Sequence, residues 1–211
     1  KCATDVVNCQ FAGITTAQLR KTRHMSSPRF SERRYLLRSA FVGASGVSLC
    51  AAHAATIDRG LVLTSLAQAM AEVDRLSQAQ ALSSSVEWTW AQTLEHCAQS
   101  IEYSMTGYPE PKAAWFQHTV GALAFAAFAA RGRMTHGLNE PIPGAKPLSP
   151  HMSLDAARAR LNQAVASFAA HSGPLKPHFA YGELSKAEYE QAHAMHVANH
   201  CSAFDIKPPA A

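Results

Sequence analysis

Three histidines near the C-terminal end of the sequence are the residues best suited to bind a metal ion. The segment HAMHVANHC, residues 193–201, contains His193, His196 and His200. Each residue of a helix turns by about 100°, so His196 and His200 would lie one turn apart on one face, with His193 a turn earlier on the same stripe. Two histidines four residues apart on a helix are a common metal-binding pair. The spacing therefore indicates a candidate metal site.

The start of this helix is well defined by the sequence, so its faces can be assigned. The segment 185–188, SKAE, matches a capping box, and the wheel that follows places the three histidines among apolar residues. They should therefore face the core, where three imidazoles are costly to satisfy without a shared partner. His193 and His200 are about 10.5 Å apart along the helix axis, so only neighbouring histidines can share one ion. The residues alone leave a metal pair and hydrogen-bonded core histidines both open.

A metal site needs further ligands from another helix, and His96 is the candidate. It shares a stripe with Gln92, Gln99 and Tyr103, and the opposite face of that helix is apolar. Hydrophobic periodicity alone predicts that this polar stripe is exposed to solvent. A metal site would instead require the stripe to turn inward and line a polar cavity, and the pattern does not decide between the two.

The elements that must position these residues are helices joined by loops rich in proline and glycine. No stretch shows the alternation of a strand, so we expect an all-α fold, most simply an antiparallel helical bundle with one additional helix. The uncharged segment AAWFQHTVGALAFAAFAA could span a membrane, but its alanine content favours a buried bundle helix. Helical periodicity predicts five segments: 57–80, about 88–106, 112–131, 153–171 and 185–204.

Two of the connecting loops have compositions that a simple spacer does not need. Residues 136–152 contain four prolines and two glycines without a helical pattern. Residues 172–183 contain Phe179 and Tyr181. Long irregular connections in compact domains are often functional, so both loops are candidates for parts of a site.

The basic charge of the protein is concentrated near its N-terminus. The formal net charge is +4, but residues 1–54 carry eight Lys/Arg against two Asp/Glu, whereas residues 55–211 carry eleven against thirteen. The larger part therefore lacks the basic stripe that nucleic acid binding requires, and we expect no nucleic acid partner.

The basic segment has the order of an export signal. Charged residues end at Arg38, an apolar stretch follows, and a small-residue A-x-A site lies at residues 52–54. The pair Arg33-Arg34 is similar to a twin-arginine signal. We therefore expect residues 1–54 to be a leader, with the signal at about 25–54, and residues 55–211 to form the exported, periplasmic domain. The alternative is an uncleaved leader that anchors the protein in the membrane.

The cysteines form no metal knuckle and no disulfide framework. The leader holds three of the five, and only Cys97 and Cys201 belong to the domain. We expect two small buried residues, although a single disulfide after export stays open.

Three segments resemble a known superfamily when taken in order. TLEHCAQSIEYSM, RGRMTHGLNEPIPGA and HFAYGELSKAEYEQAHAMHVANHCSAF are similar to an uncharacterised branch of the DinB/YfiT-like superfamily of four-helix metalloproteins, over about residues 57–205. The resemblance implies an antiparallel four-helix bundle. It also implies His96, His196 and His200 as metal ligands. His193 is extra to the superfamily pattern and is the alternative ligand if the pair on the last helix lies one turn earlier. The DinB name implies no DNA binding.

The resemblance also sets the expected chemistry. Three neutral imidazoles leave coordination positions open, which is typical of catalytic metal sites. Imidazole ligands suit zinc, nickel, iron or copper. Relatives in the superfamily include thiol-dependent transferases and isomerases, so a small thiol cofactor is one expectation, and metal-assisted hydrolysis is the other. Residues proposed for roles beside the ligands are Glu95, Gln99, Tyr103 and Tyr181.

The sequence therefore favours an exported metal-dependent enzyme, either a hydrolase or a thiol-dependent transferase, that acts on a small molecule. We see no Ser/His/Asp arrangement and no phosphate-binding loop. A non-catalytic helical protein that binds a metal or a small ligand is the alternative. We expect no membrane contact after signal cleavage, and a homodimer stays open.

Overall fold

Side-chain caps fix where the long helices of this protein begin. The computed structural model describes residues 56–208, so the predicted leader and signal lie outside the described residues. Ser65, Thr89, Ser153 and Ser185 each accept a hydrogen bond from a backbone N–H of the first turn that follows. The capping box predicted at Ser185 is confirmed. The helices are α1 Leu66–Ser77, α2 Trp90–Thr106, α3 Ala114–Phe116, the π-helical η1 Gln117–Gly121, α4 Ala122–Arg131, α5 Leu154–Ala170 and α6 Lys186–Ser202.

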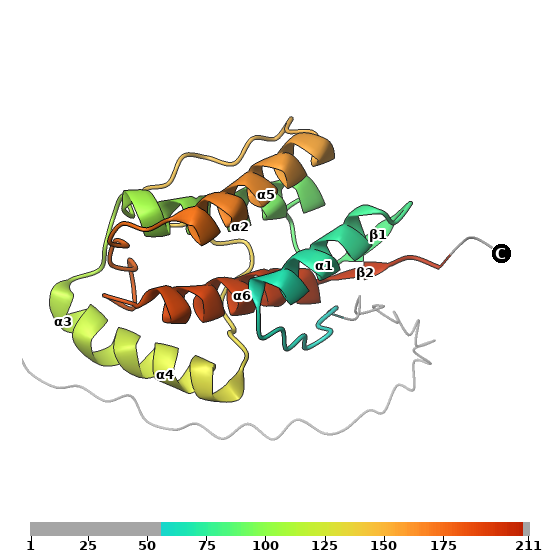
Figure 1. The fold of residues 1–211 in the computed structure, drawn as a ribbon. Coiled ribbons are helices and arrows are strands. Elements are labelled where there is room, and N and C mark those ends of the chain that lie inside the picture. The colour runs from blue at the N-terminus through green and yellow to red at the C-terminus, as the bar shows by residue number, and fades with distance from the viewer. Residues whose placement is uncertain (1–55, 209–211) are drawn as a thin grey trace, which may run out of the picture. The chain divides into compact units, whose positions relative to one another are not determined.

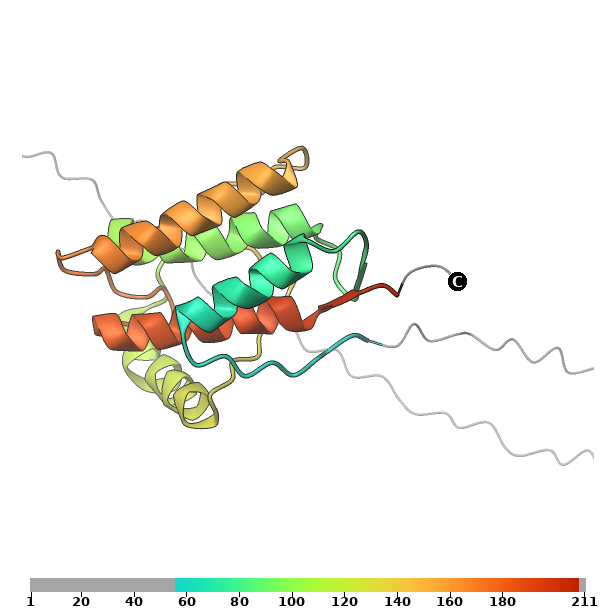
Figure 2. The ribbon, with the colours of Figure 1, turned by 45° about the vertical axis from the view of Figure 1, so that its right-hand side comes forward.

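The helices pack in layers around α6. Both ribbon views place α2 beside α5, with α6 between that pair and α4, and α1 against α6 (Figures 1 and 2). One hydrophobic core takes side chains from α1, α2, α5 and α6, so these four helices are held together by shared burial. Its largest fully buried members include Leu76, Leu94, Leu161 and Tyr189. The fold is therefore mostly helical, as the sequence predicted.

The expectation of an all-α protein needs one correction. Strand β1, Leu82–Ser84, pairs antiparallel with β2, Phe204–Ile206. Strands of three residues are too short to show an alternating pattern in the sequence. The pairing places Phe204 against Trp90, with ring centroids 4.8 Å apart, so the small sheet closes the end of the core.

The first predicted helix begins later than expected. The pattern predicted a helix over 57–80, but α1 begins at Leu66 and the chain before it is not helical. The backbone N–H of Arg59 donates to the carbonyl oxygen of Ser202, and that of Leu61 donates to the Ser202 hydroxyl. Contacts with the end of α6 therefore take the place of the first two helical turns.

The prediction of a buried third bundle helix is also wrong. α3, η1 and α4 form a continuous helical stretch at the periphery, and only one side of it faces the protein. Trp115 and Leu123 are 68% and 72% exposed. Residues 112 and 113, which were expected to be helical, precede it. In the described part of the chain, no helix has the length and apolarity needed to cross a bilayer.

Candidate metal centre

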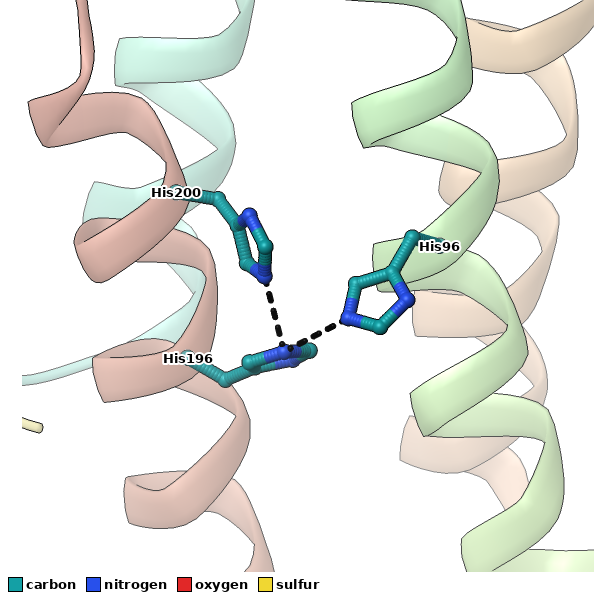
Figure 3. A group of neighbouring side chains, drawn as sticks. All are labelled: His96, His196 and His200. Atoms are coloured by element: carbon teal, nitrogen blue, oxygen red, sulfur yellow. Dashed lines mark hydrogen bonds between the residues drawn. The ribbon is translucent and has the colours of Figure 1, made fainter. Parts of the chain in front are cut away.

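Two helices bring three histidine side chains together in the interior. His96 comes from α2, and His196 and His200 lie one turn apart on α6 (Figure 3). The Nε2 atom of His196 is 3.2 Å from the Nε2 atoms of both His96 and His200. One nitrogen from each ring lies within 4.8 Å of one nitrogen from each of the others. The rings therefore converge on one point between the helices.

This convergence fits the size of a divalent metal ion. Bonds of ~2.0–2.1 Å at a tetrahedral angle place two ligand nitrogens about 3.3 Å apart. The separations of His196 from His96 and from His200, both 3.2 Å, match that value, and the nitrogens of His96 and His200 lie within 4.8 Å of each other. A neutral imidazole has only one N–H, so His196 cannot satisfy both neighbours equally well through one Nε2 atom. A shared cation resolves this arrangement, and the three residues fit a metal.

Burial keeps the three imidazoles in the form that binds metals. His96 and His200 are 2% exposed and His196 is 9% exposed. Burial lowers the pKa of His96 to about 3 and the pKa values of His196 and His200 well below the usual value, with smaller contributions from the neighbouring histidines. All three are therefore neutral at neutral pH, so each has a lone pair available to an ion.

An aromatic side chain covers the cluster from the segment before α2. Trp88 lies 4.9 Å from His96 between ring centroids and stacks on His200 at 6.2 Å with an interplanar angle of 13°. The Nδ1 atoms of His96 and His196 are buried without a hydrogen-bond partner among the described residues. Metal-bound histidines usually donate this second N–H to an acceptor. Here ring packing by Trp88 contributes to the orientation of His96.

The inward position of His96 follows from burial of α2 on both sides. Every residue from 93 to 101 is buried, although the stripe with His96 is polar. The apolar face of α2 packs on the shared core, and the polar face meets α6 and residues 136–152. Hydrophobic periodicity predicted an exposed stripe because it detects only the core face. Of the two orientations that the pattern left open, the structure has the inward one for His96 and Gln99, which are both buried.

A cavity of about 220 Å³ adjoins the histidine cluster. His96 and His196 form part of its wall, and the rest comes largely from the two loops that the sequence singled out. The segment 136–152 contributes His136, Glu140 and a short apolar run, and the segment 172–183 contributes an aromatic group. The candidate centre therefore opens onto a small space that a molecule other than water can occupy.

Polar side chains of α2 hold the first of these loops in place. The Nε2 atom of Gln99 donates to the carbonyl oxygen of Lys146 at 3.0 Å. Glu95 accepts from the backbone N–H of Ser149 at 2.7 Å and from Arg160 at 3.0 Å. Gln99 and Glu95 thus position the loop that walls the cavity, and their side-chain hydrogen bonds go to that loop and to Arg160.

The other predicted site residues have different surroundings. Tyr181 lines the cavity, and burial raises its pKa to about 12, so it stays protonated at neutral pH. Tyr103 does not line the cavity, and its ring packs on Tyr108. His193, the alternative ligand, lines the cavity but does not belong to the group of three converging nitrogens.

Three site residues were missed from the sequence: Trp88, His136 and His178. His136 begins the first loop, and its ring centroid lies 5.0 Å from that of His196 and 5.1 Å from that of His200. Its Nδ1–H donates to the carbonyl oxygen of Gly137, which leaves Nε2 as an acceptor. Both histidines lie in the loops whose composition was unusual, so loop composition was the available signal. Trp88 had no such signal, because it directly precedes a helix cap.

The two cysteines of the described region are buried free thiols. Burial raises the pKa of Cys97 to about 12 and that of Cys201 well above its usual value. Protonated thiols are weak metal ligands, and neither belongs to the converging group. The expectation of two small buried residues is confirmed.

Comparison with known families adds one assignment. The model of a family described as "Protein of unknown function (DUF1569)" matches residues 55–207. The chain belongs to this family. The matched range of DUF1569 contains the whole histidine cluster and both cavity loops. The comparisons found no match among curated proteins and none among solved structures.

Proposed function

We propose that this DUF1569 protein is a metal-dependent enzyme that acts on a small molecule. His96, His196 and His200 hold one divalent transition metal, which is zinc, nickel, iron or copper. When bound, the metal supplies Lewis-acid activation of water for hydrolysis or of a low-molecular-weight thiol for transfer. The observation that carries the proposal is the convergence of three buried, neutral imidazole nitrogens beside a cavity.

The architecture of the DinB-like superfamily belongs to the same proposal. We infer that α1, α2, α5 and α6 form an antiparallel four-helix bundle, with α4 as the additional helix. The shared core of these four helices and the origin of the histidines support it. One histidine comes from the second long helix and two, spaced H-x-x-x-H, come from the last, as the resemblance implies.

The protein's own residues position the substrate and control its surroundings. Three protein ligands leave coordination positions open, which distinguishes a catalytic centre from a closed structural one. The cavity wall is mainly apolar, which strengthens electrostatic interactions with a molecule bound inside it. Gln99 and Glu95 fix the loop that forms one side of this wall.

The test is turnover of a panel of small esters, amides and thiol conjugates. Protein loaded with one equivalent of zinc, nickel or iron is compared with protein stripped by a chelator. The proposal predicts turnover of at least one substrate class by the loaded protein and a loss of at least about 100-fold on stripping or in His200→Ala. The matched control His118→Ala changes an exposed histidine of η1 and should retain activity.

The outcomes separate the two candidate functions. Turnover that disappears with the metal supports an enzyme. A protein that binds the ion at these histidines but turns over no member of the panel contradicts catalysis and favours a non-catalytic binder. Turnover that persists in stripped protein contradicts a role for the metal.

A further inference from the structure

The cavity beside the histidine cluster has the size of a small aromatic molecule. Its volume is about 220 Å³, and an apolar cavity of ~150 Å³ is enough to hold benzene. Its apolar wall includes Met134, Ile142, Phe179 and Ala192. The space therefore admits one benzene-sized apolar body together with a small polar group.

The hydrogen bonds of His178 determine which of its atoms is free for that polar group. The backbone N–H groups of Ala180 and Tyr181 both donate to its Nδ1 atom, at 3.1 and 3.2 Å. Since Nδ1 accepts, the ring proton of the neutral form is on Nε2. The ring also stacks on Tyr181 with centroids 4.2 Å apart, so it is held in one orientation. His178 thus brings to the cavity wall a fixed N–H donor that has no hydrogen-bond partner among the described residues.

The ring of His193 adds a rigid, neutral surface to the cavity wall. His193 is 2% exposed, it lines the cavity, and its buried Nε2 atom has no hydrogen-bond partner among the described residues. Its ring packs on Tyr189 and on the edge of Phe168, so it cannot easily turn away. The Nε2 atom is fully buried, so a bound molecule contacts the ring of His193 and not this nitrogen.

The cavity has no excess of charge that would select an ion. Lys112 and Glu140 are the formally charged residues of its described lining, and their charges are opposite. Burial lowers the pKa values of His178 and His193 to about 3, so both rings are neutral at neutral pH. A neutral hydrogen-bond acceptor therefore fits this lining better than a carboxylate, which needs a charged partner when it is desolvated.

We propose that the cavity binds a small uncharged carbonyl compound with an apolar body of about one benzene ring, and that the Nε2–H of His178 donates to its oxygen. The assignment of this compound as a substrate class rests on the proposed function, because its reactive bond must lie beside His96 and His196. Recognition itself uses the cavity alone. Ligand binding can therefore be measured with and without a metal.

The experiment measures benzamide binding by isothermal titration calorimetry, in metal-free and metal-loaded protein. His178→Asn keeps an acceptor for the backbone N–H groups of residues 180 and 181 but removes the Nε2 donor. His193→Phe keeps the ring packing and removes both nitrogens. Toluene has the same apolar body without the carbonyl, so its binding reports whether the cavity keeps its shape. His118→Asn is the matched control at an exposed position.

The proposal predicts that benzamide binds the wild-type protein and that His178→Asn weakens this binding by about fivefold to tenfold, the value of one hydrogen bond. His193→Phe keeps the ring surface and should change benzamide binding by less than about twofold. Toluene binding should change by less than about twofold, and His118→Asn should match the wild type. Unchanged benzamide binding in His178→Asn overturns the proposal, as does failure of benzamide to bind the wild type. Benzamide binding without any metal binding would refute the proposed function and leave this inference intact, and the reverse result would refute this inference alone.

Discussion

Three histidines on one stripe of α6 have two different environments. His196 and His200 converge with His96, whereas His193 lies one turn earlier between Tyr189 and Phe168. Spacing predicted both the shared face and the limit of two ligands per ion from this helix. It could not tell which neighbouring pair would meet His96, because that depends on how α2 and α6 cross.

His193 should be dispensable for the stability of the fold. Phenylalanine preserves the stacked contact with Tyr189 and the edge contact with Phe168, and it removes a buried nitrogen that has no partner. We expect His193→Phe to leave the free energy of unfolding at pH 7 unchanged or to raise it by about 1–2 kcal/mol. Urea unfolding followed by circular dichroism checks this. A loss of more than about 1 kcal/mol would mean that His193 makes a stabilising hydrogen bond in the folded protein.

At the scale of elements, the sequence predicted the long helices better than the short strands and the extended segment that pack beside them. The capping box of Ser185 and Glu188 correctly predicted the start of α6. Helical periodicity predicted both ends of α2 and of α5 to within two residues. The pairing of β1 with β2 and the extended chain before α1 were missed, because both depend on contacts with the distant end of α6. Local sequence patterns do not predict contacts between residues that are far apart in the chain.

The π-helical segment η1 and the loop of residues 172–183 meet at a glycine. A Cβ atom on Gly121 would lie 1.8 Å from the carbonyl oxygen of Ala180, and Gln117 donates to the carbonyl oxygen of Phe179 in the same contact. This close approach holds the loop that carries His178. The glycine is needed here for space, and its backbone conformation is that of an ordinary helix.

Gly121→Ala should therefore destabilise the protein and displace this loop. A backbone oxygen cannot yield as a flexible side chain can, so we expect the free energy of unfolding to fall by about 2–3 kcal/mol. Urea unfolding gives the value, and hydrogen exchange of residues 172–183 should become faster. Gly173→Ala is the control, since the nearest atoms to its added Cβ belong to the His171 side chain at 3.3 Å. Equal stability of the two variants would contradict the packing described for Gly121.

At the scale of the whole molecule, the site depends on burial that no single segment encodes. α2 is covered on both sides, and two loops far apart in sequence form much of the cavity wall. The unusual composition of both loops predicted that they belong to a site, and the superfamily resemblance predicted that His96, His196 and His200 come together. The sequence could not predict that His136 and His178 reach the same cavity as His96, because loop conformation is set by tertiary contacts such as Gln99 with Lys146.

Burial of neutral histidines should make the metal-free protein sensitive to acid. The pKa of His193 is lowered to about 3 by burial, whereas an unfolded chain has a value of about 6.5. The unfolded state therefore takes up the proton first as the pH falls. The contribution of neutral His193 to the free energy of unfolding is therefore fully present above about pH 6.5. It is lost progressively as the pH falls from about 6.5 to 3.

We expect the free energy of unfolding of metal-free protein to decrease from pH 7 to pH 5, with about 2 kcal/mol of the decrease due to His193. His193→Phe should show a decrease that is smaller by this amount, and His118→Phe, an exposed control, should behave as the wild type. Urea unfolding at the two pH values makes the comparison. An identical pH dependence in wild type and His193→Phe would show that His193 is not held neutral by the fold.

The metal content of defined variants tests the central claim most directly. Protein incubated with excess zinc and freed of unbound ions should contain one ion per chain, by elemental analysis, in the wild type and in His193→Phe. His96→Ala, His196→Ala and His200→Ala should each contain close to none, because two imidazoles are too few to hold the ion against washing. The account is contradicted if His193→Phe loses the ion while His200→Ala retains it, or if the wild type binds no zinc, nickel, iron or copper.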